Sequence, residues 1–355
     1  MLTDNFKHGS SCPSKRNASR TSENWALDSH MPNPTSYDHG RSIPMPLRAG
    51  MRFLINLLWG YQMKTTCKTT MFMGAVFCVV AISGLCHAEV VCPMGEGWIL
   101  NQEFSDEFDG PVLDAEKWWD FNPEWYGRKP GYFLRENVAV KDGKLCLTAK
   151  ALKPEEVTVE NKVRGYDKFT TSTVKSKKRI LYGYFEARCK SMNSGVCNAF
   201  WLYDPLNPPA KHRPGSFSEE IDIFEVFGKP TKKENDRVLF TTVHRNLTPY
   251  VESIAYGGHA PLTNKAKKQK MPFDFHTDFH VYAFLWTPTE MKWFVDGKEV
   301  FSRDNDYYTT ALYIMFDCEI MKDWVGLPDP ADLPSTFEID YLRVWKHKDH
   351  KRVTH

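Results

Sequence analysis

The chain has 355 residues, of which 46 are Lys or Arg and 44 are Asp or Glu, so its formal net charge is only +2 at pH 7. A chain with this balance and no basic tract is unlike proteins whose main partner is a nucleic acid. Aromatic residues make up 14% of the sequence, which is high for a soluble domain. Some of these rings can form the core, and others are available for contacts at the surface.

The first part of the chain is expected to lie outside the folded domain. Residues 1–62 mix Ser, Asn, Pro, His and charged residues without an apolar period, and we interpret them as a disordered or mistranslated leader. Met63 begins a stretch with two lysines, an apolar run over 71–85 and a small-residue end at Ala88, which is typical of a secretory signal peptide. The run is shorter than the roughly 20 residues of a membrane span. The sequence therefore predicts a secreted protein that is cleaved near Ala88 and has no membrane span.

The rest of the chain, residues 89–350, is predicted to be one all-β domain. Two stretches, "NVAVKDGKLCLTAK" (137–150) and "EMKWFVDGKEVFSR" (290–303), place Asp-Gly between apolar runs, which is a strong hairpin signal. Further strands are expected at 180–191, 198–204, 238–246, 279–287, 312–320 and 335–346. Long loops are expected at 151–170, 204–217 and 252–277. Many short strands without a convincing amphipathic helix favour a sandwich or a barrel.

Five cysteines follow the predicted cleavage site, namely Cys92, Cys146, Cys189, Cys197 and Cys318. An odd number excludes complete intramolecular pairing. Cys189 and Cys197 are close enough in sequence to close a small loop, and an oxidising compartment permits such a bond. A disulfide between them and free thiols are both compatible with the sequence, and no Cys/His spacing typical of zinc occurs.

One predicted strand carries an unusual number of acids. "SEEIDIFEVFG" (218–228) holds Glu219, Glu220, Asp222 and Glu225 in an otherwise apolar run. A carboxylate without a partner costs several kcal/mol to bury, so packing alone does not explain this pattern. Glu220 and Asp222 share one face of a strand, because alternate residues point the same way. Glu225 has the opposite parity, and one β-bulge near Ile223 and Phe224 would bring it to the same face.

Three crowded carboxyl groups cannot all ionise freely, so their pKa values are driven apart. A carboxylate and a protonated acid about 5–5.5 Å apart are what retaining glycoside hydrolysis requires. The alternative is a solvated strand face whose acids pair with Lys or Arg from a neighbouring strand.

The hexapeptide "EIDIFE" (220–225) resembles the signature of glycoside hydrolase family 16 in its bulged form, found in agarases, porphyranases, kappa-carrageenases and bacterial laminarinases. Other segments are similar to the strands of that family in the same order, and together they span most of residues 98–346. They are "FSDEFDGPVLDAEKW" (104–118), "YGYFEAR" (182–188), "AFWLYD" (199–204), "FHVYAFLWTPTEMKWFVDGKEV" (279–300) and "FEIDYLRVWK" (337–346). The resemblance implies a lectin-like β-jelly-roll sandwich with an open concave cleft, and makes residues 89–350 the catalytic domain of a polysaccharide hydrolase.

The same resemblance implies roles for the acids. Glu220 matches the nucleophile and Glu225 the general acid/base, whose pKa must be raised to protonate the leaving oxygen. Asp222 lies between them and is expected to hydrogen-bond the nucleophile. No cofactor is expected for catalysis.

Several residues match positions that contact sugar in the family. Trp201 matches an aromatic residue that stacks under a sugar next to the cleaved bond, and His244 a polar contact to that sugar. Trp125, Tyr126, Arg128 and Trp324 are further candidates for substrate binding; for each of these side chains, packing or fold support is the alternative.

Segments 122–150 and 316–346 are most similar to the red-algal galactanases, the agarases and porphyranases. The resemblance therefore implies an endo-acting β-galactanase that cleaves agarose or porphyran, with β-agarase as the leading name. Lys211, His212 and Arg213 lie in a Pro-rich loop and leave open whether the galactan is neutral or sulfated. The alternatives are a β-1,3-glucanase of the same family, a transglycosylase, or a carbohydrate-binding jelly roll without activity. A monomer is expected.

Many members of the family hold a structural calcium ion on the convex side, between the first and the last strands. Asp106, Glu107 and Asp340 are the candidate ligands here. They supply oxygen, which calcium prefers, although such a site needs 6–8 ligands in all.

Overall fold

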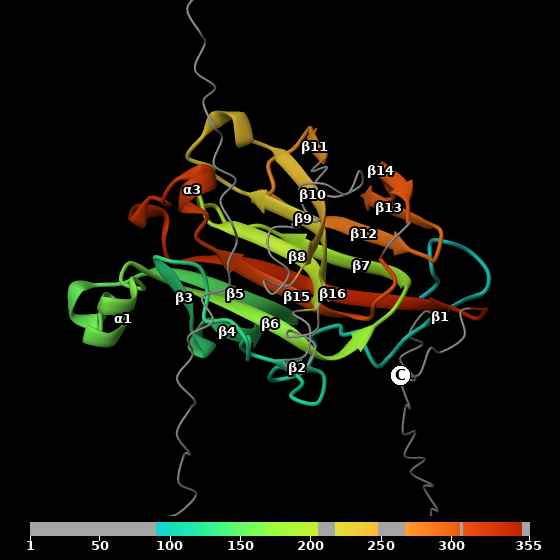
Figure 1. The fold of residues 1–355 in the computed structure, drawn as a ribbon, viewed down its shortest axis with the longest axis horizontal. Coiled ribbons are helices and arrows are strands. Elements are labelled where there is room, and N and C mark those ends of the chain that lie inside the picture. The colour runs from blue at the N-terminus through green and yellow to red at the C-terminus, as the bar shows by residue number, and fades with distance from the viewer. Residues whose placement is uncertain (1–89, 205–216, 248–266, 306–307, 350–355) are drawn as a thin grey trace, which may run out of the picture. The chain divides into compact units, whose positions relative to one another are not determined.

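The computed structural model describes residues 90–204, 217–247, 267–305 and 308–349 (Figure 1). All of these residues fall within one compact unit, His87–His355. The predicted leader and signal peptide lie in residues 1–88, outside the described part of the chain.

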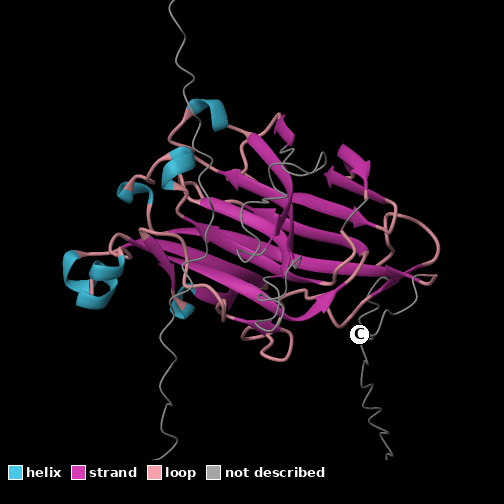
Figure 2. Cartoon of the chain, viewed as in Figure 1, coloured by secondary structure: helices cyan, strands magenta, loops and turns pink. Residues whose placement is uncertain are grey.

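The described residues are mostly β-strand, and the short helices lie at the margins of the strands (Figure 2). The strands are β1 (Trp98–Leu100), β2 (Trp118–Trp119), β3 (Gly131–Phe133), β4 (Val138–Lys141), β5 (Lys144–Ala151), β6 (Phe169–Ile180), β7 (Gly183–Lys190), β8 (Cys197–Asp204), β9 (Phe217–Phe227), β10 (Val238–Leu247), β11 (Lys267–Lys270), β12 (His280–Trp286), β13 (Glu290–Val295), β14 (Lys298–Asp304), β15 (Leu312–Glu319) and β16 (Ser335–His347). The helices are α1 (Val159–Arg164) and α3 (Lys322–Val325), with 3-10 turns at Arg135–Asn137, Pro154–Glu156, Lys233–Asn235 and Pro330–Asp332.

The strands form two layers. The first layer runs in the order β11-β10-β9-β8-β15-β6, with β2 paired to β6. The second runs β5-β16-β7-β12-β13-β14, with β1 and β4 at its sides, and pairing between β5 and β6 joins the two layers. Rings from both layers meet in the core: the Phe224 and Tyr282 centroids are 4.3 Å apart, and those of Phe316 and Phe337 are 6.4 Å apart. This arrangement confirms the predicted all-β sandwich.

Both Asp-Gly hairpins are present as predicted, joining β4 to β5 and β13 to β14. Asp142 and Gly143 have φ of 52° and 69°, and Asp296 and Gly297 have φ of 49° and 75°. Positive φ at both central residues is what the favoured two-residue hairpin turn requires, and Asp and Gly tolerate it better than bulky residues.

Strand β6 was not predicted, and its first residues fall in the expected loop 151–170, which also holds α1. Its sequence, "FTTSTVKSKKRI", is polar, yet the first eight side chains are buried. Neighbouring strands cover it on both sides, because β15 and β2 pair with one part and β5 and β3 with another. Strand β11 likewise falls in the expected loop 252–277, and most of the 204–217 loop lies outside the described residues.

All five described cysteines are free thiols. Cys189 packs in the main core between the layers, whereas Cys197 belongs to a separate apolar cluster. The two cysteines therefore do not form the disulfide that their spacing allowed. Within the described residues, no helix is long and apolar enough to cross a membrane.

Candidate active site

A β-bulge in β9 places the three acids on one face. Phe200 and Trp201 of β8 are consecutive, but their partners on β9 are Phe224 and Asp222, so Ile223 is the extra residue. The pairing of β9 with β10 shifts at the same place. The bulge lies where the parity of the sequence predicted it, and it returns Glu225 to the face that carries Glu220 and Asp222.

We call this side of the first layer the acidic face. It lies opposite the core, since the intervening Ile221, Ile223 and Phe224 are in the main core cluster. Register pairing aligns residues of four other strands beside the acids, namely Ala199, Trp201 and Tyr203 of β8, Tyr313, Met315 and Asp317 of β15, Lys175 and Arg179 of β6, and Thr242 and His244 of β10. Glu219 points the other way, and its buried carboxylate accepts a hydrogen bond of 3.1 Å from the Thr310 backbone N–H.

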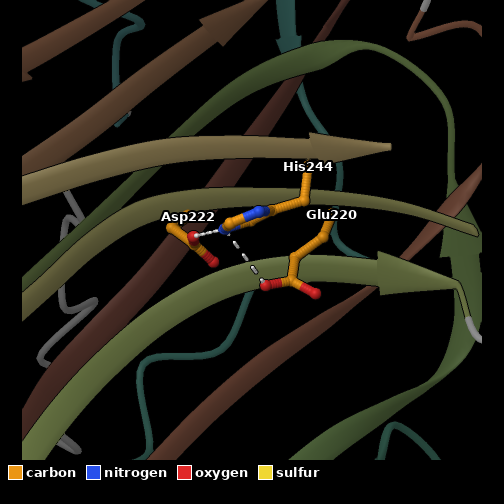
Figure 3. A group of neighbouring side chains, drawn as sticks. All are labelled: Glu220, Asp222 and His244. Atoms are coloured by element: carbon orange, nitrogen blue, oxygen red, sulfur yellow. Dashed lines mark ion pairs between the residues drawn. The ribbon is translucent and has the colours of Figure 1, made fainter. Parts of the chain in front are cut away.

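His244 bridges two of the acids (Figure 3). Its Nε2 lies 3.4 Å from Asp222 Oδ2 and 3.8 Å from Glu220 Oε1. The side chains of Glu220 and His244 are 27% and 31% exposed, whereas Asp222 is 5% exposed. A ligand approaching from solvent can therefore reach Glu220 and His244. Asp222 is buried and contacts His244.

The pKa values of Glu220, Glu225 and His244 differ strongly from the ordinary values of these groups. Burial, followed by the charge of Asp222, raises the pKa of Glu220 to about 7, and the nearby His244 limits the rise. The same causes raise the pKa of Glu225 well above its ordinary value. Burial lowers the pKa of His244, but Glu220 and Asp222 more than offset this and raise it to about 10. At neutral pH, His244 is therefore a cation, and the raised pKa of Glu225 favours its protonated form.

The surroundings of Glu220 and Glu225 differ in kind. Glu225 faces Phe240 across the strand pair, and the Cys197 Sγ lies 3.9 Å from its Oε1. This side belongs to an apolar cluster of Cys197, Phe227, Val238, Phe240, Met321 and Val325, with Trp324 packed against it. Glu220 instead lies opposite His244 and Tyr203. Environments that drive two carboxyl groups apart in pKa suit one to be an acid and the other a nucleophile.

The predicted binding residues Trp125, Arg128 and Trp201 come together on the other side of the acids. The Trp201 indole N–H donates to Asp317 Oδ2 at 2.9 Å, and Trp125 packs against the small cluster that contains Trp201. Arg128 forms an ion pair with Glu319, and its Cζ lies 5.5 Å from the centre of the Trp125 ring. The predicted residue Trp324 lies on the Glu225 side, and Tyr126 stacks on Tyr132. Lys211, His212 and Arg213 lie outside the described residues.

Asp317 and Glu319 were not singled out from the sequence. Burial raises the pKa of both carboxyl groups. The charge of Glu319 raises the pKa of Asp317 further, whereas Arg128 limits the rise in the pKa of Glu319. The signal was present in "MFDCEI" (315–320), where acids two residues apart interrupt an apolar strand, as they do in β9.

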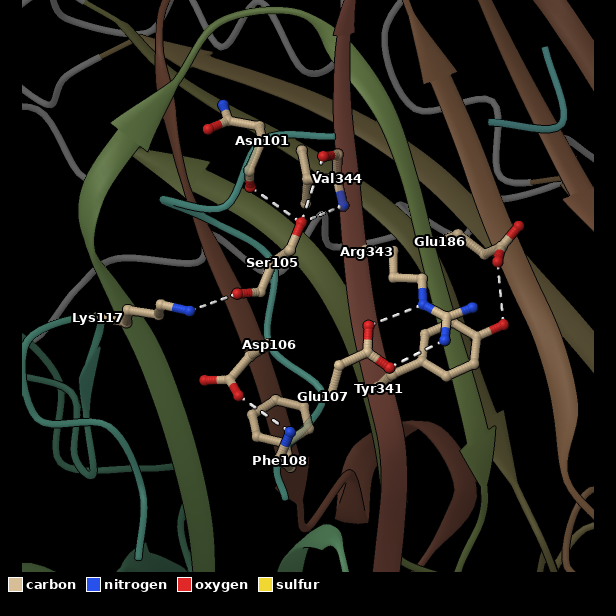
Figure 4. Close-up of polar contacts among 10 residues, drawn as sticks. All are labelled: Asn101, Ser105, Asp106, Glu107, Phe108, Lys117, Glu186, Tyr341, Arg343 and Val344. Carbon is tan, nitrogen blue, oxygen red and sulfur yellow. Dashed lines mark hydrogen bonds and ion pairs between the residues drawn. The ribbon is translucent and has the colours of Figure 1, made fainter. Parts of the chain in front are cut away.

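The three candidate calcium ligands are each engaged by a donor of the protein; Figure 4 shows two of them, Asp106 and Glu107. Asp106 accepts hydrogen bonds from the Trp118 indole and the Phe108 backbone, at 2.9 and 3.0 Å. Both oxygens of Glu107 accept from Arg343, and Asp340 pairs with Arg188 at 2.8 Å. Among the described residues, these three acids are not within metal-binding distance of one another as a group. Each one is held by a protein donor, so the set does not fit the oxygen-rich shell that calcium needs.

A two-layer sandwich with interacting carboxyl groups on one sheet face is the arrangement expected of a jelly-roll glycoside hydrolase. The family model described as "Beta-porphyranase A-D, GH16 domain" matches residues 98–347 of this chain. The chain therefore belongs to glycoside hydrolase family 16.

Known relatives agree with this assignment. The chain is 37% identical over 281 residues to β-porphyranase D of Zobellia galactanivorans, covering 72% of this chain and 62% of the relative. It is 32% identical over 269 residues to the kappa-carrageenase of Pseudoalteromonas carrageenovora, covering 71% and 65%. The chain thus spans slightly less than two thirds of the length of these two relatives. The crystal structure of porphyranase B from Zobellia galactanivorans matches with a TM-score of 0.57 at 27% identity, covering 70% of this chain and 92% of that one.

Proposed function

We propose that the protein is an endo-acting hydrolase that cleaves β-linkages of a red-algal galactan with retention of configuration, and that a sulfated galactan of the porphyran type is its leading substrate. The observation that carries the proposal is the bulge in β9, which puts Glu220, Asp222 and Glu225 on one face. The galactan is supported by the porphyranase description of the matching family model and by the names of the relatives.

In the first step, the ionised carboxylate of Glu220 attacks the anomeric carbon of the sugar. Glu225 donates its proton to the glycosidic oxygen, the bond to the leaving sugar breaks, and a glycosyl ester forms on Glu220. The raised pKa of Glu225 favours the protonated form that a general acid needs, and Glu220, with a pKa of about 7, is ionised at and above neutral pH.

In the second step, Glu225 accepts a proton from water, whose oxygen attacks the anomeric carbon and releases Glu220. Esterification removes the negative charge of Glu220, and that charge is one of the causes that raise the pKa of Glu225. The pKa of Glu225 is therefore lower in the intermediate, which suits a base. His244, a cation beside Glu220 and Asp222, favours the anionic form of the nucleophile in the free enzyme.

Binding of the polysaccharide is assigned to the aromatic and cationic residues beside the acids. Trp201, fixed by Asp317, offers a ring for stacking under a sugar. Arg128, whose side chain is 26% exposed, lies against Trp125 and supports binding of an anionic substituent such as a sulfate ester.

Hydrolysis of a panel of polysaccharides tests the proposal. The purified protein is incubated with porphyran, agarose, kappa-carrageenan and laminarin, and new reducing ends are measured. We expect release from porphyran and its loss in Glu220→Gln and Glu225→Gln, with unchanged circular dichroism. Release of reducing ends from agarose alone would contradict the proposed preference for a sulfated galactan. Release from laminarin alone would contradict the proposal that the substrate is a galactan. No release from any of them, despite binding, would indicate a carbohydrate-binding protein.

We further propose that the protein is exported as a monomer through the segment 63–88. Expression of the whole chain in a bacterial host, followed by N-terminal sequencing and light scattering of the exported protein, tests this. We expect a mature N-terminus at Glu89 and a monomer mass. Retention inside the cell with residues 63–88 intact would contradict export.

A further inference from the structure

A buried lysine lies on the acidic face beyond Trp201. The side chain of Lys175 is 1% exposed, and its ammonium pairs with the carboxylate of Glu124. The Nζ also lies 4.1 Å from the ring centre of Tyr313 and 5.7 Å from that of Trp119. Burying a cation is costly unless it is paired and well packed, so this lysine holds two rings and a loop residue in a fixed arrangement.

Register pairing shows where this arrangement lies relative to the acids. Trp201 is opposite Asp222 on one side and Met315 on the other; Met315 is opposite Lys175, and Lys175 is opposite Trp119. Strands are spaced by about 4.8 Å, so Lys175 is about 14 Å from β9 along the layer. The acidic face thus continues, strand by strand, from Asp222 on β9 to Trp119 on β2.

This end of the face presents rings and a cation to solvent. Trp119 and Tyr313 are half-buried, with ring centres 6.2 Å apart. The Arg179 side chain is 37% exposed; its Cζ lies 5.6 Å from the Tyr313 ring, and it pairs with Asp204 at 2.8 Å. We call Trp119, Tyr313 and Arg179, supported by Lys175, the aromatic edge. Rings next to a guanidinium suit a sugar that carries an anionic ester, because the ring packs on the sugar and the guanidinium pairs with the ester.

We propose that the aromatic edge is an outer subsite, which binds an anionic sugar of the same chain that is not adjacent to the cleaved bond. This inference rests on the proposed function, because an enzyme that cuts within a polysaccharide holds several consecutive sugars. Lys175 is a positioning residue in this subsite. It is too buried to contact substrate, and through Glu124 it also fixes the loop that carries Trp125 and Arg128.

The test compares substrates by length and by charge. Porphyran oligosaccharides are separated by length, and part of each pool is chemically desulfated. In Trp119→Ala, we expect KM for the long oligosaccharides to rise about tenfold with little change in kcat, while kcat/KM for the shortest cleaved oligosaccharide stays as in wild type. Trp119→Phe is expected to restore most of the loss. Trp98→Ala, which removes a half-buried ring from the second layer, is the matched control and should leave KM and kcat for the long oligosaccharides and kcat/KM for the shortest one unchanged.

The charge of the subsite is tested with Arg179. We expect Arg179→Gln to reduce the preference for sulfated over desulfated long oligosaccharides, with Arg128 accounting for what remains, and Arg179→Lys to retain more of it than Arg179→Gln. Equal effects of Trp119→Ala on short and long substrates, or an unchanged sulfate preference in Arg179→Gln, would overturn the subsite. Wild-type protein that cleaves no galactan would instead overturn the proposed function.

A second measurement separates a loss of binding from a loss of stability in the Trp119 and Arg179 variants. In the Glu220→Gln background, calorimetry gives the affinities for long and short sulfated oligosaccharides, and melting curves give the folded fraction. We expect the Glu220→Gln protein with Trp119 intact to bind the long oligosaccharide more tightly than the short one. We expect the same difference when Trp119→Phe is added. Equal affinities for both lengths with Trp119 intact would overturn it.

Discussion

Trp293 of β13 donates its indole N–H to the backbone carbonyl of Asp222, at 3.2 Å, from the opposite layer of the sandwich. Trp293 is 1% exposed, so this hydrogen bond crosses the core. The carbonyl belongs to the residue that directly precedes the bulged Ile223. The second layer therefore holds the bulge from behind, and with it the relative positions of the acids.

Trp293→Phe is expected to lower the free energy of unfolding by about 1–3 kcal/mol, because a buried carbonyl loses its donor while the apolar ring is largely kept. We also expect kcat to fall, since the bulge is no longer fixed. Denaturant unfolding and hydrolysis rates measure the two effects. Trp286→Phe is the matched control, because Trp286 is equally buried and donates to Tyr308 at 3.1 Å. An equal fall of kcat in both variants would contradict a specific role for Trp293.

His244→Gln is expected to shift the acidic limb of the pH–rate profile to higher pH. The cation of His244 lowers the pKa of Glu220 from what burial and Asp222 would otherwise give. Its removal raises that pKa above about 7, so a higher pH is needed to ionise the nucleophile. The profile of kcat/KM measures the shift, with His280→Gln as control, since His280 pairs with Asp296 on the second layer. If the acidic limb of the kcat/KM profile stays in place or moves to lower pH, the electrostatic role of His244 is contradicted.

Cys197 is expected to affect the pKa of Glu225, the proposed general acid. Its Sγ lies 3.9 Å from Glu225 Oε1, and burial raises the thiol pKa, so the group is a neutral, weak donor. Serine is a stronger donor to the charged form of Glu225, so Cys197→Ser should move the basic limb of the profile to lower pH. Cys197→Ala removes the donor and should move it the other way. Shifts in the same direction would rule out this contact as the cause, and Cys189→Ser controls for a general effect of a buried hydroxyl.

Glu225→Gln is expected to be more stable than wild type at alkaline pH. The folded pKa of Glu225 lies well above its unfolded value near 4.5, so its stabilising contribution is complete below pH 4.5 and is lost as pH rises through the folded pKa. Glutamine does not titrate. The difference in Tm between variant and wild type should therefore grow as the pH rises from about 4.5 towards the folded pKa of Glu225, whereas the exposed Glu116→Gln should show no such trend. A difference independent of pH would show that Glu225 is not held protonated.

Removal of calcium is expected to leave the stability unchanged. Asp106, Glu107 and Asp340 are each held by donors of the protein itself, and a chelator has nothing to withdraw from them. Melting curves with EDTA and with added calcium test this. A Tm that falls in EDTA and recovers with calcium would mean that these acids rearrange around an ion.

The features that sequence predicted best are those that depend on local chemistry. Asp-Gly between apolar runs predicts both hairpins, and the parity of the acids in 220–225 predicts the bulge. Strand β6 was missed because its Thr, Ser and Lys side chains carry no apolar period; only its neighbours bury them. The same limit applies to Lys175 and Asp317, since a strand pattern does not reveal which ring or which acid faces them across the layer.

Glu220 and Glu225 are proposed to carry out hydrolysis through a covalent intermediate. The ¹H NMR spectrum of the first reducing ends released from porphyran, recorded before mutarotation, tests this directly. Two displacements at the same carbon predict that the β-anomer appears first. First appearance of the α-anomer would mean a single displacement by water and would contradict the assignment of Glu220 as the nucleophile.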